Sequence, residues 1–590
     1  MKKEYFLATT ALENFWDPNK TILFLGEWCL DSNRKNYWQK LDGLHLENYL
    51  SDNKERDFAC KEINKIYEQA LPQIADILNT IHETDHRLHY WRIVLGPWLH
   101  TYITSFYDRF KMISYVLKEY PDLTTITLSP KSFVVPQDTN EFNRGLSSDL
   151  LNLQIFSKIF LYLKKDFPSK SLKFNLGDTF VSSPLSWKQN LFGVISNVYR
   201  FLVIRLIKNP VVISNSYFPK KTEFYLIIKF FGRIFSTLGM HSEYQFNDYD
   251  FDKREKLKQI SLDGDNNFLK CLSSLIYSDI PKCFIEGYEE LCQVGKKNYP
   301  SFPAVIFSSN SWWYDEIFKL WAAECSQNGI PLHGTPHGGD FGIRLYMPSF
   351  EHETKILDYY YSWGWNRENC NAEVISMPAT KLMSISHIGA SNSKSGVLWV
   401  TTASPRYVGF EFPFTSPESF QDYLSWHNRF VKSLSAKVLR FTSLRPHPQD
   451  YGWNIVDRIK EHSSIKIIDS SKVSFAESIS SCRLYVCDHL STTFTEALAA
   501  NKPTILFWDP SLNKEHPDEE KYLELLRSKG VLFNTPEAAA EAVDNVYDDV
   551  ESWWNDLDRQ KAINIFKERH CKSSYRASKI WFQELQKNIY

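Results

Sequence analysis

Two segments in the last third of the chain carry side chains suited to binding a phosphate group. They are residues 445–448 (Arg-Pro-His-Pro) and residues 488–498, which begin Asp-His-Leu and continue with Ser491, Thr492 and Thr493. Three hydroxyl groups stand where a helix is predicted to begin, and backbone N–H groups and the helix dipole favour an anion there. An arginine and a histidine add positively charged donors. The residue types therefore predict a pocket for a phosphate-bearing ligand.

His447 has two alternative roles. Arg445 precedes it by two residues, so both side chains point to the same side if the segment is extended. The flanking prolines restrict the backbone and would aim the imidazole. A histidine here can donate to a phosphate oxygen and offset charge on a leaving group. A histidine at a strand end is otherwise structural, and the residue pattern leaves both roles open.

The hydroxyl cluster at 491–493 also has a structural alternative, because Ser and Thr are preferred as helix N-caps. Asp488, directly ahead of the cluster, is expected to belong to the nucleotide site. Glu496 lies one turn into the helix. It either complements the helix dipole or accepts hydrogen bonds from the hydroxyl pair of a ribose or sugar.

A further polar segment follows the predicted strand 397–402. Thr402, Ser404 and Arg406 would bring two hydroxyl groups and a guanidinium group toward the same phosphate. Arginine suits bidentate phosphate contacts. The alternative is an ordinary turn with an exposed arginine.

The candidate general base is His337, in a loop that contains three glycines, which let a backbone approach a ligand closely. Asp340 is a possible orienting carboxylate for this histidine. Glu27, at the end of the predicted strand 21–25, is a second candidate base, and His333 is a further one. The alternative for the loop is a surface turn with an incidental histidine.

The elements that must position these residues form an α/β pattern. In the last third, short apolar runs alternate with helical stretches, which indicates a parallel sheet with helices on both faces. Ligands bind outside the carboxyl ends of such strands. The predicted strands there are 397–402, 436–441, 465–469, 484–487 and 503–507.

The first half mixes strands with long helical stretches. Residues 55–120 have helical spacing, with breaks expected at Pro72 and at Gly96-Pro97. The final residues, 562–590, are predicted to form a helix. Further strands are predicted at 21–25, 123–128, 304–308 and 358–363, and further helices at 146–166 and 315–328.

Size and composition bound the class of protein. A chain of 590 residues should divide into two large domains or more. A net charge of -2 excludes a generally basic nucleic-acid binder. The ten cysteines include no CxxC pair, which suits a reducing compartment. The first residues lack the apolar core of a signal peptide, and no apolar run is long enough to predict a transmembrane helix.

Two acidic segments, 248–252 and 263–265, are interpreted as solvated loops, so no metal site is predicted. Residues 188–240 differ in kind, because they are apolar and aromatic and carry eight basic side chains against one acid, Glu223. They are either ordinary core with lysines reaching outward to water, or a surface that lies on an anionic membrane.

Several motifs resemble bacterial surface-polysaccharide transferases. The pattern at 488–494 (Asp-x-x-Ser-Thr-x-Phe) with Lys-Pro-x-Ile at 502–505 is similar to these enzymes. His447-Pro448 resembles a dipeptide of sialyl-, polysialyl- and Kdo transferases and of CDP-glycerol glycerophosphotransferases. His337-Gly338 is similar to a His-Gly of several of these families. The opening segment and residues 90–99 (YWRIVLGPWL) resemble a transferase family of bacterial O-antigen loci.

The resemblance implies a GT-B architecture, in which two Rossmann-like domains face each other across a cleft, with extra helices in the N-terminal domain. Residues 1–380 would bind the acceptor and hold the base His337. Residues 395–565 would bind the nucleotide donor, with His447 on its phosphate. A C-terminal helix within 566–590 would cross back to the first domain.

Two departures from the related families affect the donor. Glycerophosphotransferases favour two serines and a following Asp where this chain has Ser491-Thr492 and Thr495-Glu496. The acidic motif of GT-B sialyltransferases is approached only by Asp263-Gly264.

The sequence thus predicts an inverting, metal-independent glycosyltransferase. It would move Kdo or another nonulosonate from a CMP-activated donor to a glycan or lipid-linked acceptor in surface-polysaccharide or O-antigen synthesis. No cofactor other than this donor and no nucleic-acid partner is expected. The predicted location is the cytoplasm, with contact to the inner face of the membrane through 188–240. The alternatives are a CDP-polyol phosphotransferase and a non-catalytic glycan-binding scaffold of the same fold.

Overall fold

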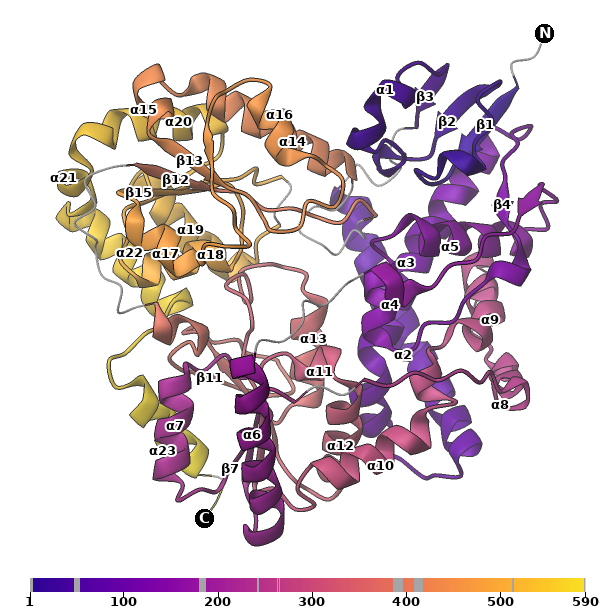
Figure 1. Ribbon diagram of the computed structural model, residues 1–590, viewed down its shortest axis with the longest axis horizontal. Coiled ribbons are helices and arrows are strands. Elements are labelled where there is room, and N and C mark those ends of the chain that lie inside the picture. The colour runs from indigo at the N-terminus through magenta and orange to yellow at the C-terminus, as the bar shows by residue number, and fades with distance from the viewer. Residues whose placement is uncertain are drawn as a thin grey trace.

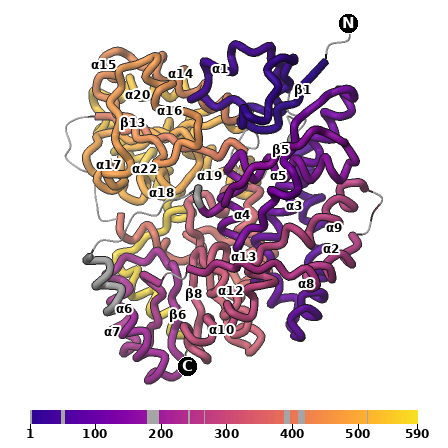
Figure 2. Tube along the Cα trace, turned by 45° about the vertical axis from the view of Figure 1, so that its right-hand side comes forward, coloured from indigo at the N-terminus to yellow at the C-terminus, as the bar shows by residue number. Residues whose placement is uncertain are grey.

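The computed structural model contains two six-stranded parallel sheets, a three-stranded sheet and a set of long helices (Figure 1). The described residues between 396 and 570 form one lobe, which in both views lies above the other large sheet (Figures 1 and 2). The N-terminal region lies beside both. The structure describes residues 4–46, 53–179, 187–240, 243–262, 264, 266–385, 396–407, 417–511, 514–587 and 589.

The sheet of the last third has the strand order β14-β13-β12-β15-β16-β17, which is the Rossmann order 3-2-1-4-5-6. All its pairs are parallel. Because the strand order reverses between β12 and β15, the loops that follow these two strands diverge and mark the switch point. The strands are β12 (Val397–Val400), β13 (Thr442–Arg445), β14 (Lys466–Ile467), β15 (Leu484–Cys487), β16 (Thr504–Phe507) and β17 (Leu532–Phe533).

Helices cover both faces of this sheet, as predicted. Trp399 of β12 packs in a cluster with α14 (Pro417–Ser433) and α20 (Pro536–Val546). Its neighbour Val400 packs in another with α18 (Thr492–Ala499) and α22 (Leu557–His570). Adjacent side chains of a strand point to opposite faces, so α14 and α18 lie on opposite sides of the sheet.

One predicted strand is wrong. Residues 436–441 contain the short helix α15 (Ala436–Arg440), and the strand begins only at Thr442. The side chain of Ser435 caps this helix by accepting a hydrogen bond from the Val438 backbone N–H at 3.3 Å. Arg445 is consequently the last residue of a strand.

The second large sheet has the order β11-β10-β9-β8-β6-β7, with its own switch point between β6 and β8. The predicted strands 304–308 and 358–363 are confirmed as β8 and β10, and the helix at 315–328 as α12 (Glu316–Gln327). The strands are β6 (Val211–Ser214), β7 (Ile234–Ser236), β8 (Val305–Ser308), β9 (Leu332–Gly334), β10 (Tyr359–Ser362) and β11 (Glu373–Ser376).

The N-terminal strands do not join either large sheet. β1 (Tyr5–Ala8), β2 (Thr21–Phe24) and β3 (Gly43–His45) pair with one another, and Phe6 bridges to Thr124. The predicted helix 146–166 is confirmed as α5 (Asp149–Tyr162). The strand end that carries Glu27 therefore belongs to a separate small sheet.

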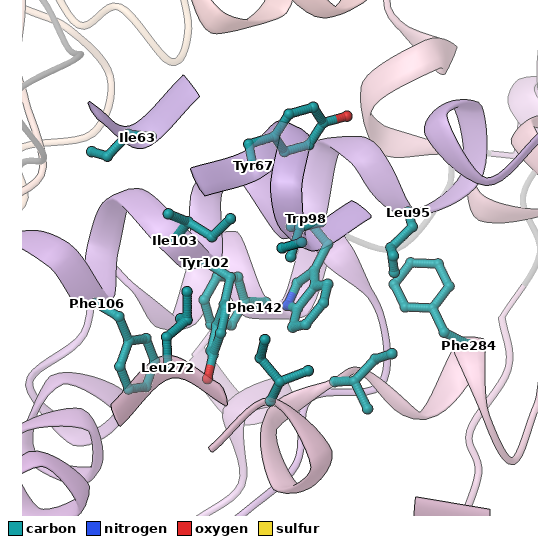
Figure 3. Packing of buried hydrophobic residues seen from close by; sticks show 14 of the residues in the cluster. Ile63, Tyr67, Leu95, Trp98, Tyr102, Ile103, Phe106, Phe142, Leu272 and Phe284 are labelled. Atoms are coloured by element: carbon teal, nitrogen blue, oxygen red, sulfur yellow. The ribbon is translucent and has the colours of Figure 1, made fainter. Parts of the chain in front are cut away.

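The breaks expected at Pro72 and at Gly96-Pro97 are wrong. α2 (Asn53–His82) and α3 (Leu88–Glu119) run through both prolines, and the chain turns between them. Tertiary packing outweighs the local cost of proline here, because α3 buries Trp98, Tyr102 and Phe106 against Phe142, Leu272 and Phe284 (Figure 3). Gly96 is required by close approach, since an added Cβ would lie 2.8 Å from His352 Cε1.

The final segment, predicted as one helix, is two. α22 ends at His570, and α23 (Ala577–Gln586) packs against the β6–β11 sheet beside α7 (Lys220–Lys229) (Figure 1). Trp581 of α23 contacts Phe307 edge to face at 5.3 Å and donates to the Pro378 carbonyl at 2.9 Å. The chain thus passes into the upper lobe and returns. Within the described residues, no helix combines the length and apolar character needed to cross a membrane.

Candidate active site

The segments singled out in the sequence meet at the carboxyl edge of the β12–β17 sheet. Register pairs Val400 with both Arg445 and Cys487, so the chain positions two residues further on, including His447 and His489, follow at the same edge. Two strand spacings separate these histidines, about 10 Å between backbones. Partial desolvation, followed by the charge of His489, lowers the pKa of His447. The loops after β13 and β15 therefore converge.

Asp488 was predicted to contact the ligand, but its carboxylate is buried beneath the edge. It accepts hydrogen bonds from Trp399 Nε1 at 2.9 Å, Tyr423 Oη at 2.7 Å and His489 Nδ1 at 2.8 Å. His427 Nε2 lies 3.2 Å away without hydrogen-bond alignment. Burial alone would raise the pKa of Asp488, but the two histidines hold it at about 2. Asp488 is therefore an ionised positioning residue.

His489 is the partner that Asp488 positions. Burial would lower its pKa, but the Cys487 sulfur and the Asp488 carboxylate raise it to about 10. The side chain is 7% exposed, so a fixed imidazolium lies next to the start of α18 at neutral pH. The sequence prediction did not select His489 as a ligand, although a histidine directly after an aspartate at a strand end is the signal that could have identified it.

The hydroxyl groups at 491–493 were also interpreted as a helix N-cap, but no side-chain cap is formed at the start of α18. In the described structure Ser491 occupies the N-cap position, but its hydroxyl accepts no hydrogen bond from the first turn. It lies 3.0 Å from Thr493 Oγ1 instead. First-turn N–H groups of a helix need partners from outside the helix. These N–H groups and the charge of His489 both favour negative charge at the start of α18.

Arg445 and Arg406 do not lie where the sequence placed them. Arg445 Nη1 donates to the Val473 carbonyl at 2.8 Å and to Ser478 Oγ at 3.0 Å, so it supports the loop and helix beyond β14. Arg406 forms an ion pair with Asp149 at 2.6 Å and joins the upper lobe to α5. Both guanidinium groups thus make contacts that hold elements of the protein together.

The other residues after β12 have mainly structural contacts. The Thr402 backbone N–H donates to Tyr423 Oη at 2.9 Å. Ser404 is buried, and its carbonyl accepts from Trp453 Nε1 at 2.8 Å. These contacts fix the turn after β12, so the edge is held in shape around His489.

The glycine-rich loop lies directly on α18. The Gly339 backbone N–H donates to Thr492 Oγ1 at 3.1 Å. A Cβ on Gly339 would lie 2.3 Å from Thr495 Oγ1 and 3.0 Å from Thr492 Cα. The sequence interpretation was that the glycines let the loop approach a ligand. In the structure, Gly339 permits this loop of the β6–β11 sheet to contact α18 of the β12–β17 sheet.

Asp340 does not orient His337 by a direct bond. Its carboxylate pairs with Arg344 Nε at 2.8 Å, and Arg344 Nη2 donates to the Leu490 carbonyl at 2.7 Å, just before α18. Through Arg344, Asp340 holds the loop against the segment that precedes α18. Asp340 acts on the His337 ring only through its charge.

His337 lies two residues before the contact with Thr492. Burial lowers its pKa to about 4, so the ring is neutral at pH 7 and can accept a proton. Lys381 lowers this pKa too, and it acts on Glu496, whose pKa burial raises. The Lys381 ammonium lies over the Tyr217 ring at 5.3 Å. Lys381 thus joins His337 and Glu496 in one cluster.

The other candidate bases lie elsewhere. Glu27 contacts His45 Nδ1 at 3.2 Å and Gln421 Nε2 of α14 at 3.0 Å. It is therefore on the α14 side, whereas His337 meets the α18 side. His333 is fully buried, with Nδ1 2.8 Å from Tyr361 Oη inside the sheet.

Comparison with known proteins identifies the family. A model of the LIC12162 family transferases matches residues 5–585. The chain belongs to this transferase family. No curated protein matches it in sequence.

The LIC12162 family chain is also similar to solved structures. One is an alpha,alpha-trehalose-phosphate synthase (UDP-forming) from Burkholderia vietnamiensis, with 8% identity, 65% and 100% of the two chains covered and a TM-score of 0.34. Another is the spinosyn rhamnosyltransferase SpnG, with 10% identity, 64% and 100% covered and a TM-score of 0.31. A third is the Streptomyces sp. SF2575 glycosyltransferase SsfS6, with 9% identity, 61% and 96% covered and a TM-score of 0.27. The GT-B-like architecture of this transferase follows from its own strand orders.

Two cavities of this transferase lie away from the edge that carries His489. One of about 910 Å³ is lined by Lys158, Tyr162 and Lys282 among others, in the N-terminal helical region. One of about 820 Å³ lies between α19 (Pro517–Ser528) and α22. Within the described ranges, no group of three or more His, Cys, Asp and Glu side chains is arranged to hold a metal ion.

Proposed function

We propose that this transferase is an inverting, metal-independent glycosyltransferase. It would move an acidic sugar, Kdo or another nonulosonate, from a CMP-activated donor to a hydroxyl of a surface-polysaccharide glycan. The observation that carries the proposal is the Asp488–His489 pair, which holds an imidazolium beside the open start of α18 at the switch point.

The charged edge suits the departing nucleotide phosphate. When the bond between sugar and phosphate breaks, negative charge develops on CMP. His489 and the first-turn N–H groups of α18 would stabilise this charge. His447, at the same edge, supplies a further N–H donor. Fixed positive groups of this kind perform the charge neutralisation that other transferases assign to a divalent ion.

The loop after β9 supplies the base. The acceptor hydroxyl attacks the anomeric carbon on the face opposite the phosphate, and its proton passes to neutral His337. One displacement inverts the configuration. His337 suits this role because the Gly339–Thr492 contact places its loop against the helix that binds the phosphate.

Lys381 is the residue that favours an acidic sugar as the transferred group. Its ammonium group acts on both His337 and Glu496. A nonulosonate carries a carboxylate, which would pair with this ammonium group. Glu496 would accept a hydrogen bond from a sugar or ribose hydroxyl.

Release of CMP from a CMP-sugar, measured by mass spectrometry, tests the proposal. His489→Gln should lower turnover by about 100-fold, as for loss of one oriented donor to a developing anion. His447→Ala should lower it by a similar factor, about 100-fold. His462→Ala, an exposed histidine outside the site, is the matched control. Undiminished release by His489→Gln rejects the assigned role.

Thermal shift with CMP, CTP and CDP-glycerol separates the alternatives, because a ligand stabilises the state that binds it. Preferential stabilisation by CDP-glycerol indicates polyol-phosphate transfer. No shift with any nucleotide, while binding of a glycan persists, indicates a non-catalytic scaffold.

A further inference from the structure

An apolar surface surrounded by positive charge lies at the β7 edge of the lower sheet. It is formed by the outward face of α6 (Trp187–Leu206) and by the turn that joins α7 (Lys220–Lys229) to β7, and is called the α6–α7 surface below. Both views place α6 and α7 at the same end of the molecule (Figures 1 and 2). The two helices pack on opposite faces of the sheet, since Val203 of α6 is buried with Val212 and Phe235, and Leu226 of α7 with Val211 and Ile234. The exposed apolar side chains of the surface are Val198, Phe201, Leu202, Leu206 and Phe231.

Between residues 196 and 206 the outward face of α6 is largely apolar, contrary to a helix on a water-facing surface. Val198, Leu202 and Leu206, which is 72% exposed, follow four-residue spacing along one stripe, and Phe201, 56% exposed, flanks this stripe. The inward face is anchored by polar contacts. Tyr199 Oη donates to the Ile234 carbonyl at 2.8 Å and Arg200 Nη1 to the Leu238 carbonyl at 3.0 Å. The orientation of α6 is therefore fixed, and the apolar stripe stays outside.

The turn into β7 extends the same surface. Phe231 is 89% exposed. The turn is held against α6 by Tyr199 Oη, which donates to the Gly232 carbonyl at 3.2 Å, and against β6 by Val211 N–H, which donates to the Arg233 carbonyl at 2.8 Å. The apolar groups thus come from two neighbouring pieces of chain, α6 and the turn, that are bonded together.

Positive charge surrounds these groups. The single acid between residues 196 and 240, Glu223, is half-buried and accepts from Ser216 Oγ at 3.2 Å. The partner that fits such a surface is anionic on the outside and apolar beneath. The exposed cations on α6 and in the segments next to it are Arg205, Lys208 and Arg233.

We propose that the α6–α7 surface binds the face of an anionic lipid bilayer. Phe201, Leu206 and Phe231 insert at the boundary between headgroups and acyl chains, and the surrounding cations contact lipid phosphates. A second copy of this chain fits less well. A two-fold interface would place this patch against itself, so that cations face cations.

Vesicle co-sedimentation tests the proposal with the whole protein and no substrate, so its failure is distinct from a failure of the proposed transfer reaction. The protein should sediment with mixed phosphatidylglycerol–phosphatidylcholine vesicles, much less with pure phosphatidylcholine, and less as salt is added. Equal binding to both vesicles would overturn the assignment to anionic lipid.

Paired substitutions locate the contact. R205Q with R233Q should lower the partition coefficient about 25-fold, since each cation near an anionic surface contributes about a factor of five. F201S with F231S should lower it at least tenfold, because two exposed aromatic rings lose their apolar burial. L557S is the control, since Leu557 is 86% exposed on α22 in the other lobe.

Two measurements keep the outcome decisive. All variants change exposed side chains, so melting temperatures should match that of the unmodified chain. Sedimentation velocity without lipid should show one species unaffected by F231S. Unchanged vesicle binding by both paired variants, or an assembly that F231S dissociates, would contradict the lipid-binding surface.

Discussion

The two six-stranded sheets have switch points of opposite character. At the β12–β15 switch, a buried carboxylate, Asp488, holds an imidazolium, His489. At the β6–β8 switch, Ser214 Oγ lies 2.8 Å from Ser311 Oγ, and Asn215 Nδ2 donates to the same oxygen at 2.8 Å. Buried ion pairs contribute little net stability and are costly when one partner is lost. The comparison shows a charged pair at one switch point and neutral hydrogen bonds at the other, and the proposed function assigns the charged one to the nucleotide phosphate.

The largest effect should come from removing the buried charge. Asp488→Asn leaves His489 without its carboxylate, so we expect CMP release to fall about 100-fold. The free energy of unfolding should fall by about 3 kcal/mol, as when a buried pair loses one member. Urea denaturation and the release assay measure the two effects. A variant as stable and active as the unmodified chain would break the comparison.

The same pair should give stability a pH dependence. The folded-state pKa of His489, about 10, lies above its ordinary value, so its contribution is full below about pH 6.5 and is lost as pH rises through about 10. The folded-state pKa of Asp488, about 2, is depressed, so its contribution is lost only as pH falls below about 4 toward 2. The advantage of the unmodified chain over His489→Gln should shrink by a few kcal/mol between about pH 6.5 and 10.

Thermal melts of both proteins across this pH range provide the measurement. A difference that stays constant up to pH 10 would show that the imidazole is not charged in the folded protein. The neutral switch point predicts no comparable dependence for Ser311→Ala.

The contact between the Gly339 loop and α18 should be sensitive to a single added methyl group. Gly339→Ala places a Cβ within 3.0 Å of the Thr492 Cα, so the loop must shift and carry His337 with it. We expect a loss of about 2 kcal/mol in stability, typical of overpacking, with at least tenfold slower CMP release.

Gly177→Ala is the matched control for this substitution, because its Cβ would meet ordinary contacts at 3.5 Å or more in an exposed turn. If both alanine variants behave alike, the loop does not position the base.

The smallest effect should come from the neutral switch point. Ser311→Ala removes the oxygen that bonds Ser214 and Asn215, which should cost about 1 kcal/mol and leave CMP release within a factor of three. Ser214 keeps its bond to Thr237 Oγ1 at 2.8 Å. If Ser311→Ala lowered the free energy of unfolding as much as Asp488→Asn, the difference between the two switch points would not be one of charge.

Local patterns predicted much of the architecture. The apolar strands before Thr402 and Asp488, and the hydroxyl-rich start of α18, are encoded by adjacent residues, so they could be recognised from the sequence. The breaks predicted at Pro72 and Pro97 were wrong because the packing of α2 and α3 outweighs the local cost of proline in a helix. The strand predicted at 436–441 was wrong because Ser435 caps the helix α15 there.

The site was harder to predict, because its partners come from distant elements. The sequence predicted Arg406 as a phosphate ligand, but its guanidinium pairs with Asp149, 257 positions away. The sequence predicted Asp488 as a ligand residue, but its carboxylate accepts hydrogen bonds from Trp399, Tyr423 and His489. Residue type alone does not show which polar side chain faces substrate and which supports another. His489 and Lys381 gain their roles only from neighbours that the fold supplies.

The return of the chain to the lower sheet has a mechanical consequence. Ala379 N–H donates to the Lys572 carbonyl at 2.9 Å, so the outgoing and the returning strands of the connection are fastened together at one place. Two linked passages restrict how the lobes can move relative to each other more than a single connection would. Separation of the lobes would have to break the contacts Gly339–Thr492, Arg344–Leu490 and Arg406–Asp149 as well.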